Sequence, residues 1–420
     1  MRTLPVVKTG LGGAAILLAG FLAAAPAQAS TGVSVPCNTA ALITAITAAN
    51  TSGGGTINLA LGCTYALTQV NNTDPMAGPN GLPVITSQIT INGSRTTIAG
   101  NGTFRILMVT GSGNLTVQGL TITGGNAIAG GGIANLEGTL TVNHTTVTGN
   151  TATEIGGGGI FSGTMGTGPA GTAILNFSQV NGNTSLSSAG GILNHAGTLI
   201  LNASKVNNNT AAVGGGGIAS GTGGMGGNNS SFLSVNLSQV NNNTANGGPA
   251  SGAGGIANGG TATINASQVN GNIAPGGNGG GILNHGAMTI NASTVNNNTT
   301  PTDNSGDLGG GGGIANLNIT ALTGAADSGV LTITLSQVNG NTATGHGGGI
   351  LEDGVMANDM LGLPGGPLTL KLSQVTGNSA GFGGGIYAST GSPVTLTISL
   401  IAKNTPDNCE PLGSISGCKN

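Results

Sequence analysis

The sequence has little charge and few aromatic residues. Of its 420 residues, 5% are charged and 2% are aromatic, and tryptophan is absent. An ordinary soluble domain carries about 25% charged residues, so this composition argues against a typical globular enzyme. The net charge is −3, and no basic stripe or polybasic run offers a site for nucleic acid or an anionic membrane.

Glycine is abundant, with 84 residues, but it follows no strict triplet period, which excludes collagen. The chain is 37% hydrophobic and its net charge is small. Disordered chains show the opposite balance, with low hydrophobicity and high net charge. The sequence therefore predicts a folded protein of unusual, glycine-rich architecture.

Residues 1–29 have the pattern of a secretory signal peptide. Arg2 and Lys8 precede an apolar run, and Ala27-Gln28-Ala29 forms a small-x-small cleavage site. The alternative is an uncleaved membrane anchor. No later run reaches the 18 or so apolar residues that a second span needs. We expect the mature chain to start near Ser30, without a membrane span, in a secreted or cell-surface location.

Two short motifs alternate along the chain and define an internal repeat. The first is Gly-Gly-Ile, which occurs nine times, with its isoleucines at Ile133, Ile160, Ile192, Ile218, Ile256, Ile282, Ile314, Ile350 and Ile386. The second is V-x-x-N, or I-x-x-N in the last copy, and its asparagines are Asn150, Asn183, Asn209, Asn243, Asn272, Asn298, Asn341, Asn378 and Asn404. The shortest repeats are 26 residues long, as from Ile192 to Ile218.

Between the motifs, apolar and polar residues alternate over three to five residues, which is typical of strands. Weaker copies from Ile89 and Leu115 bring the total to about eleven. Short strands and glycine turns at a fixed period predict a solenoid of stacked coils, about 50 Å long at 4.8 Å per coil. In such a stack the V-x-x-N asparagines form a ladder at a turn, where asparagine tolerates a left-handed backbone and can bond its neighbours along the ladder.

The paired motifs resemble the GGA-[ILV] and FxxN repeats of polymorphic outer membrane proteins, with valine in place of phenylalanine. More widely, the chain is similar to right-handed parallel β-helices of the pectate-lyase-like superfamily. The resemblance covers residues 37–420 and implies an all-β, right-handed parallel β-helix. It also implies a short N-terminal capping helix, which matches the helical spacing of Leu42, Ile46 and Ala49.

The chain divides into four predicted parts. After the signal peptide, residues 30–88 form an N-terminal cap, residues 89–404 the β-helix repeats, and residues 405–420 a C-terminal cap loop. The four cysteines allow three pairings. Because the coils hold the two ends apart, we expect the local disulfides Cys37–Cys63 and Cys409–Cys418, which export permits.

Carboxylates gather in one region only. Two inserts, 317–329 and 352–366, leave the same turn of adjacent coils and carry Asp327, Glu352, Asp353 and Asp359, with His346 nearby. These residues are the candidates for acid–base catalysis, which in a glycosidase needs two carboxylates, or for a Ca²⁺ site. The alternative is a pair of solvated acidic loops, and we expect no other cofactor.

The remaining titratable residues indicate structural roles. His195 and His285 share a column three coils apart, about 14 Å, which is too far for a common metal ion. His144 lies in a mostly apolar column and is expected to pack inward. Arg95 and Arg105 are expected to be solvated or to end a ladder.

We therefore expect an exported, non-catalytic rod with an adhesin-like binding or structural role. Its partner would be a cell-surface glycan or a component of a host or cell envelope, bound at the turns with the inserts 161–171, 219–231, 317–329 and 352–366. The alternative is a polysaccharide lyase or glycoside hydrolase that uses the carboxylates of 317–366. A threonine column also suggests a flat recognition face, with ice as one ligand.

Overall fold

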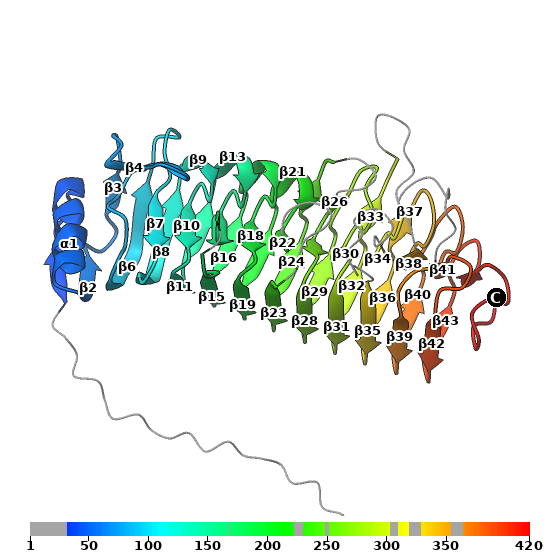
Figure 1. Ribbon diagram of the computed structural model, residues 1–420. Helices are drawn as coiled ribbons and strands as arrows, with labels where there is room; N and C mark the ends of the chain where they lie inside the picture. Colours follow the sequence, from blue (N-terminus) through cyan, green and yellow to red (C-terminus); the bar gives the residue numbers. More distant parts are fainter. Residues whose placement is uncertain are drawn as a thin grey trace, which may run out of the picture. The chain divides into compact units, whose positions relative to one another are not determined.

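The structure, a computed structural model, describes residues 32–166, 168–221, 230–247, 252–302, 310–318, 329–353 and 364–420. These residues belong to one compact unit, Gly32–Asn420, which is all β except for the helix α1 (Thr39–Thr51). The unit is a right-handed parallel β-helix, as predicted, and its coils stack in chain order (Figure 1). The predicted signal peptide, residues 1–29, lies outside the described residues.

An 11-stranded sheet, here called the isoleucine sheet, contains the Gly-Gly-Ile isoleucines. Its strands are β7 (Leu107–Thr110), β10 (Ile133–Leu136), β14 (Ile160–Gly163), β18 (Ile192–His195), β22 (Ile218–Ser220), β27 (Ile256–Asn258), β30 (Ile282–Asn284), β34 (Ile314–Leu317), β38 (Ile350–Asp353), β41 (Ile386–Ala388) and β44 (Cys409–Glu410). Each motif isoleucine from Ile133 to Ile350 pairs with that of the next coil, as Ile192 does with Ile218, and Ile386 pairs with Cys409. This pairing confirms the prediction that the Gly-Gly-Ile motif occupies the same position in successive coils.

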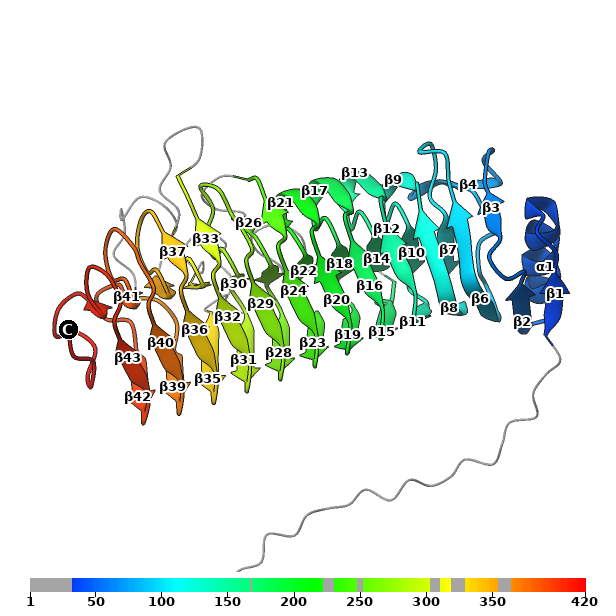
Figure 2. The same ribbon diagram turned by 180° about the vertical axis from the view of Figure 1, so that it is seen from behind.

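A 23-stranded sheet, here called the wide sheet, receives two strand segments from each coil. Its N-terminal strands are β1 (Val33–Val35), β2 (Gly54–Leu59), β3 (Thr64–Ala66), β6 (Gln88–Ala99) and β8 (Asn114–Thr123). The first segments of the later coils are β11 (Thr139–Asn143), β15 (Thr172–Asn176), β19 (Thr198–Asn202), β23 (Phe232–Asn236), β28 (Thr261–Asn265), β31 (Ala287–Asn291), β35 (Val330–Thr334), β39 (Leu368–Lys371) and β42 (Val394–Thr397). The second segments are β12 (Thr146–Thr148), β16 (Gln179–Asn181), β20 (Lys205–Asn207), β24 (Gln239–Asn241), β29 (Gln268–Asn270), β32 (Thr294–Asn296), β36 (Gln337–Asn339), β40 (Gln374–Thr376) and β43 (Leu400–Ala402). Figures 1 and 2 show these strands from opposite sides.

Three smaller sheets complete the described part of the chain. A six-stranded sheet comprises β9 (Asn126–Ala129), β13 (Thr151–Gly156), β17 (Thr184–Ser188), β21 (Thr210–Gly215), β25 (Thr244–Ala245) and β26 (Gly252–Ala253). Two strand pairs are β33 (Thr299–Thr300) with β37 (Thr342–Ala343), and the antiparallel hairpin β4 (Asn72–Asp74) with β5 (Gly78–Asn80).

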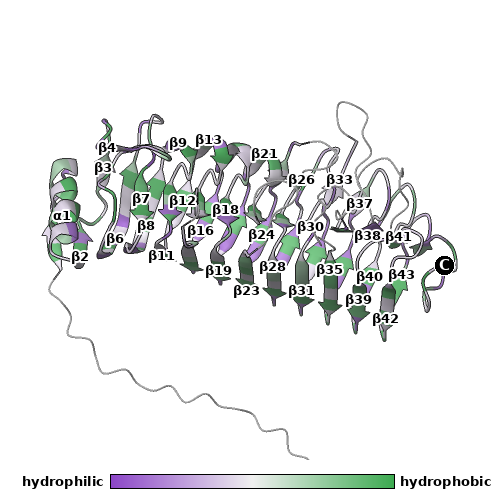
Figure 3. Ribbon diagram, in the orientation of Figure 1, coloured by the Kyte–Doolittle hydropathy of each residue, from purple (hydrophilic) through white to green (hydrophobic). Residues whose placement is uncertain are grey.

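The interior of the coils is a continuous apolar core. Each coil contributes its motif isoleucine and three residues of the wide sheet, for example Ile192, Leu199, Leu201 and Val206, all 0% exposed. Along the strands, hydrophobic and hydrophilic residues are intermixed, as strand periodicity requires (Figure 3). No single coil can enclose such a core, so stacking itself stabilises the fold.

The V-x-x-N asparagines form a buried ladder that runs from coil to coil. Asn209, for example, donates from its backbone N (2.9 Å) and its Nδ2 (3.0 Å) to Oδ1 of Asn243. Its Nδ2 also donates to the carbonyl oxygen of Val180, 2.9 Å away. The left-handed residue is not the ladder asparagine but the residue before it, such as Asn208 (φ 56°). The expected hydrogen bonding along the ladder is therefore confirmed, whereas the expectation of a left-handed backbone at the asparagine itself was wrong.

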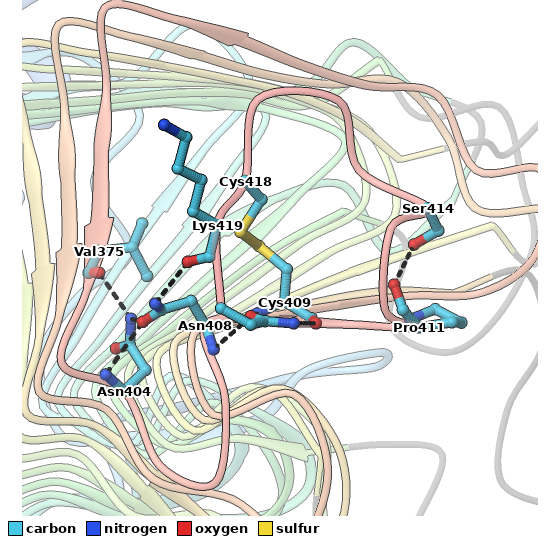
Figure 4. The surroundings of a disulfide bond; sticks show 9 residues. Val375, Asn404, Asn408, Cys409, Pro411, Ser414, Cys418 and Lys419 are labelled. Carbon is cyan, nitrogen blue, oxygen red and sulfur yellow. Dashed lines mark hydrogen bonds between the residues drawn. A yellow bond between two sulfur atoms is a disulfide. The ribbon is translucent and has the colours of Figure 1, made fainter.

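Both ends of the described unit have caps. At the N-terminal end, Oδ1 of Asn38 accepts a hydrogen bond from Ala41 N and caps α1, whose Leu42 and Ile46 are buried. At the other end, Asn408 acts as the final rung, since its Oδ1 accepts from Nδ2 of Asn404 at 3.0 Å (Figure 4). Asn420 Oδ1 in turn accepts from the backbone N of Asn408 and of Cys409.

The two disulfides are the local ones, Cys37–Cys63 and Cys409–Cys418. The first joins the start of α1 to the strand region after β2, and the second closes the C-terminal loop (Figure 4). Within the described ranges, no helix is both long and apolar enough to cross a membrane.

Arg105 is buried, contrary to the prediction of a solvated or ladder-end charge. Its side chain is 0% exposed and donates to the carbonyl oxygens of Ala77 and Ala129 and to Oδ1 of Asn80. Burial lowers its pKa to about 10, and the charge of Asp74 opposes this shift. Arg105 therefore fixes the β4–β5 hairpin against the coils. Arg95, by contrast, is exposed.

Candidate functional site

Glu352 lies on β38 at the end of a buried polar column on the isoleucine sheet. In the preceding coils the column consists of Asn135, Ser162, Asn194, Ser220, Asn258, Asn284 and Asn316. Asn284 donates from Nδ2 to Oδ1 of Asn316 at 2.7 Å, and Asn316 donates to Oε2 of Glu352 at 2.9 Å. Glu352 thus replaces the asparagine of the next rung.

The Glu352 side chain is 0% exposed, and burial raises its pKa to about 9. The hydrogen bond from Asn316 opposes the shift, and the charge of Asp353 adds to it. Its other oxygen, Oε1, has no hydrogen-bond partner among the described residues. At neutral pH the carboxyl group is therefore protonated and shielded from solvent. A general acid must come within hydrogen-bond reach of its substrate, which this burial does not favour.

The other candidate site residues are only partly described. Asp327 and Asp359 lie outside the described residues. Asp353 is half-buried at the end of β38, next to Glu352, and successive residues of a strand point to opposite faces. Among the residues that the structure describes, no three His, Cys, Asp or Glu side chains group closely enough to hold a metal ion.

His346 belongs to an aromatic cluster that the sequence did not indicate. Its ring stacks on that of Phe382, with centroids 5.2 Å apart, and contacts the tilted ring of Tyr387 at 4.4 Å. Glu410 is the register neighbour of Tyr387 on β44. The pKa of Glu410 is raised by desolvation and by Asp407, while the charge of His346 acts in the opposite direction. His346 lies 36 positions before Phe382 and 41 before Tyr387, and Glu410 lies 23 positions after Tyr387, so only coil register brings them together.

The two column histidines do not form a shared site. Nδ1 of His195 lies 2.8 Å from the carbonyl oxygen of Thr164. His285 Nε2 has no hydrogen-bond partner in the described part of the chain, and burial lowers the pKa of His285 to about 4. His285 is therefore neutral at physiological pH.

The outer face of the wide sheet is polar and nearly uncharged. Its outward asparagines form a second ladder, in which each Nδ2 donates to Oδ1 of the preceding coil over 2.9–3.1 Å. The residues of this ladder are Asn143, Asn176, Asn202, Asn236, Asn265 and Asn291. In the nine coils from β11 to β43, whose strands are all described, Lys205 and Lys371 are the only charged outward residues.

A bend separates the two strand segments of each coil, and one residue there has a left-handed backbone. In the nine coils from β11 to β43 these residues, here called the bend column, have φ between 46° and 52°: His144, Phe177, Ala203, Leu237, Ala266, Ala292, Leu335, Leu372 and Ile398. The equivalent residues of β6 and β8 are Arg95 (φ 53°) and Gly119 (φ 67°). His144 is exposed and stacks on Phe177 with ring centroids 5.1 Å apart, so the prediction that it packs inward was wrong. The left-handed backbone turns the side chain at this position outward.

A buried serine fixes each bend from the inside. Ser178 Oγ donates to the carbonyl oxygens of Val142 (2.9 Å) and Asn176 (2.8 Å), and it accepts from the backbone N of Thr145. Ser204, Ser267, Ser293, Ser336 and Ser373 repeat this arrangement. The bend column is therefore held rigidly on the outer surface.

No protein-family profile matches the sequence, and no curated protein matches it. Solved structures of similar shape include the A-module of the Azotobacter vinelandii mannuronan C-5 epimerase AlgE6 (TM-score 0.41, 14% identity, 86% of this chain and 94% of that one). The pectate lyase Pel9A has a TM-score of 0.37 at 13% identity, over 86% of this chain and 74% of the other. The A-module of A. vinelandii AlgE4 has a TM-score of 0.38 at 12% identity, over 87% and 94%. These similarities assign no activity to this chain.

Proposed function

We propose that this protein is an exported, non-catalytic β-helix rod that binds at a cell surface or within an extracellular structure. The observation that carries the proposal is the outer face of the wide sheet, where hydrogen-bonded asparagines form an ordered and nearly uncharged array. Side chains that are already ordered lose little conformational entropy on binding.

Three further features support an exported, surface-binding protein. The sequence begins with a signal-peptide pattern, and both disulfides belong to the kind that forms in oxidising compartments. The Gly-Gly-Ile and V-x-x-N motifs also resemble the repeats of polymorphic outer membrane proteins. An adhesin-like role is consistent with all three features.

The alternative is a polysaccharide lyase or glycoside hydrolase that uses the acidic inserts. Burial of Glu352 weighs against this alternative, because the carboxyl group does not reach solvent. The predicted binding turns at the inserts remain a prediction, since much of them lies outside the described residues.

The two functions are separated by one experiment on the purified mature protein. We would measure its retention on isolated envelope material and, in parallel, the release of reducing ends from a polysaccharide panel with and without Ca²⁺. We expect retention without release. Release above that of an E352A/D353A/D359A variant would contradict the proposal and support catalysis at the inserts.

A further inference from the structure

The bend column has an anomalous composition for a left-handed backbone. Left-handed residues are mostly glycine, asparagine or aspartate, and a bulky or β-branched residue there is a conformational outlier. From β11 to β43 the bend column contains neither glycine nor asparagine, although β8 has Gly119 at this position, and it includes Phe177, Leu237, Leu335, Leu372 and the β-branched Ile398.

A second left-handed position in the same coils provides an internal comparison. It precedes the buried ladder asparagine and has φ between 55° and 65°. Its residues are Gly149, Gly182, Asn208, Asn242, Gly271, Asn297, Gly340, Gly377 and Lys403. Eight of these nine are therefore the residue types that the backbone prefers, so the repeat does not otherwise avoid them.

The large apolar side chains of the bend column are also exposed. Phe177 is 61% exposed, Leu237 71% and Ile398 83%. They contribute little burial to the core, and their left-handed backbone costs stability. Strained residues that the fold does not need are a mark of functional sites.

Polar columns flank the bend column on both sides. On one side is the outward asparagine ladder, such as Asn176 and Asn202. On the other side, one residue before the motif valine, lie Thr146, Gln179, Lys205, Gln239, Gln268, Thr294, Gln337, Gln374 and Leu400. The three columns together, here called the bend strip, form an apolar ridge between two rows of mostly amide and hydroxyl groups.

We infer that the bend strip binds a neutral polysaccharide chain; this rests on the proposed binding function and names its ligand class. Amides both donate and accept hydrogen bonds, as sugar hydroxyls do. Pyranose rings present apolar C–H faces between hydroxyl edges, which complement a narrow apolar ridge with polar flanks. In the nine coils from β11 to β43, Lys205 and Lys371 are the only charged outward strand residues, so this part of the sheet offers few partners to an acidic glycan.

The test uses a variant that makes the ridge polar with asparagine, a residue that tolerates the left-handed backbone of these positions. The variant is F177N/L237N/L335N/L372N/I398N. The matched control, N208G/N242G/N297G, changes the other left-handed position. Binding of the full mature protein is measured by cosedimentation with insoluble cellulose, chitin and mannan, and with insoluble calcium polygalacturonate as the acidic comparison.

We expect the wild type and the control to bind at least one neutral polymer and to prefer it over polygalacturonate. The five-residue variant should bind that polymer at least about tenfold more weakly than the wild type, which corresponds to a loss of about 1.4 kcal/mol in binding free energy. Its unfolding midpoint in urea should not fall, because asparagine tolerates the left-handed backbone. A loss of binding without a loss of stability separates a contact role from a structural one.

Three outcomes would overturn the inference. They are unchanged binding by the five-residue variant, preference of the wild type for polygalacturonate, and ridge-dependent pairing of rods in analytical ultracentrifugation without glycan binding. Each of them would leave the proposed rod function intact, because envelope retention and the absence of sugar release are measured separately.

Discussion

A Cβ atom on Gly281 would stand 2.8 Å from Nδ2 of Asn298, so the two repeat motifs of one coil are in direct contact. The same added atom would lie 2.7 Å from the carbonyl oxygen of Gly313 in the next coil. The glycine motif therefore leaves room for the asparagine ladder. Each motif requires the other, which explains why they recur together.

We expect Gly281→Ala to destabilise the protein by about 1–3 kcal/mol, because overpacking against backbone atoms is not relieved by a rotamer change. The measurement is the free energy of unfolding in urea. Gly166→Ala is the control, since a Cβ atom there meets nothing within 4 Å. Equal stability of the two variants would show that the contact between the two motifs does not require glycine at position 281.

Removal of a side chain from the buried asparagine ladder should lower the free energy of unfolding when the residue lies in the middle of the stack of coils. Asn243→Ala leaves Asn209 N and Nδ2, which donate to Oδ1 of Asn243, without that acceptor. Each buried group left unsatisfied costs about 1–3 kcal/mol, and thermal unfolding would measure the sum. Gln268→Ala, at an exposed position on the outer face, should change stability little. A similar loss in both variants would contradict a specific role for the ladder.

Arg105→Met should destabilise the region of the β4–β5 hairpin. The substitution removes the donors to Ala77 O, Ala129 O and Asn80 Oδ1, which are buried with the side chain. We expect a loss of about 1–3 kcal/mol per unsatisfied acceptor and faster proteolysis between residues 72 and 80. Arg95→Met provides the exposed control, and equal proteolysis of the two variants would refute the anchoring role.

Glu352 should make stability depend on pH. Its folded pKa, about 9, lies above its ordinary value of 4.5, so its contribution is fully present below pH 4.5. The contribution is lost as the pH rises from about 4.5 to about 9, by at most about 1.4 kcal/mol per pH unit. Urea unfolding at pH 5, 7 and 9 measures this slope.

Glu352→Gln keeps the shape of the side chain but does not titrate, so the free energy of unfolding should depend less on pH. An unchanged slope in this variant would assign the pH dependence to another group. Sugar release that survives in the same variant would, independently, exclude Glu352 as a general acid.

The sequence predicted the architecture because stacking repeats each local pattern in register. The motif isoleucines and the alternation of apolar residues follow from spacing, and both disulfides follow because stacked coils hold the two ends of the chain apart. The burial of Arg105 could not be predicted, because its acceptors come from a hairpin outside the repeat and from the following coil. The outward orientation of His144 was also missed, since a left-handed bend reverses the side-chain direction expected from strand alternation.

The in-phase pairing of Ile160 with Ile192 and of Ile192 with Ile218 has an evolutionary consequence. Loss of the 26 residues from Ile192 to Gly217 would join Gly191 directly to Ile218 and restore the same motif. Every column would then continue with one rung fewer. Unequal recombination within the gene could thus shorten or lengthen the molecule, and with it the reach of its outer face, without any new interface having to evolve.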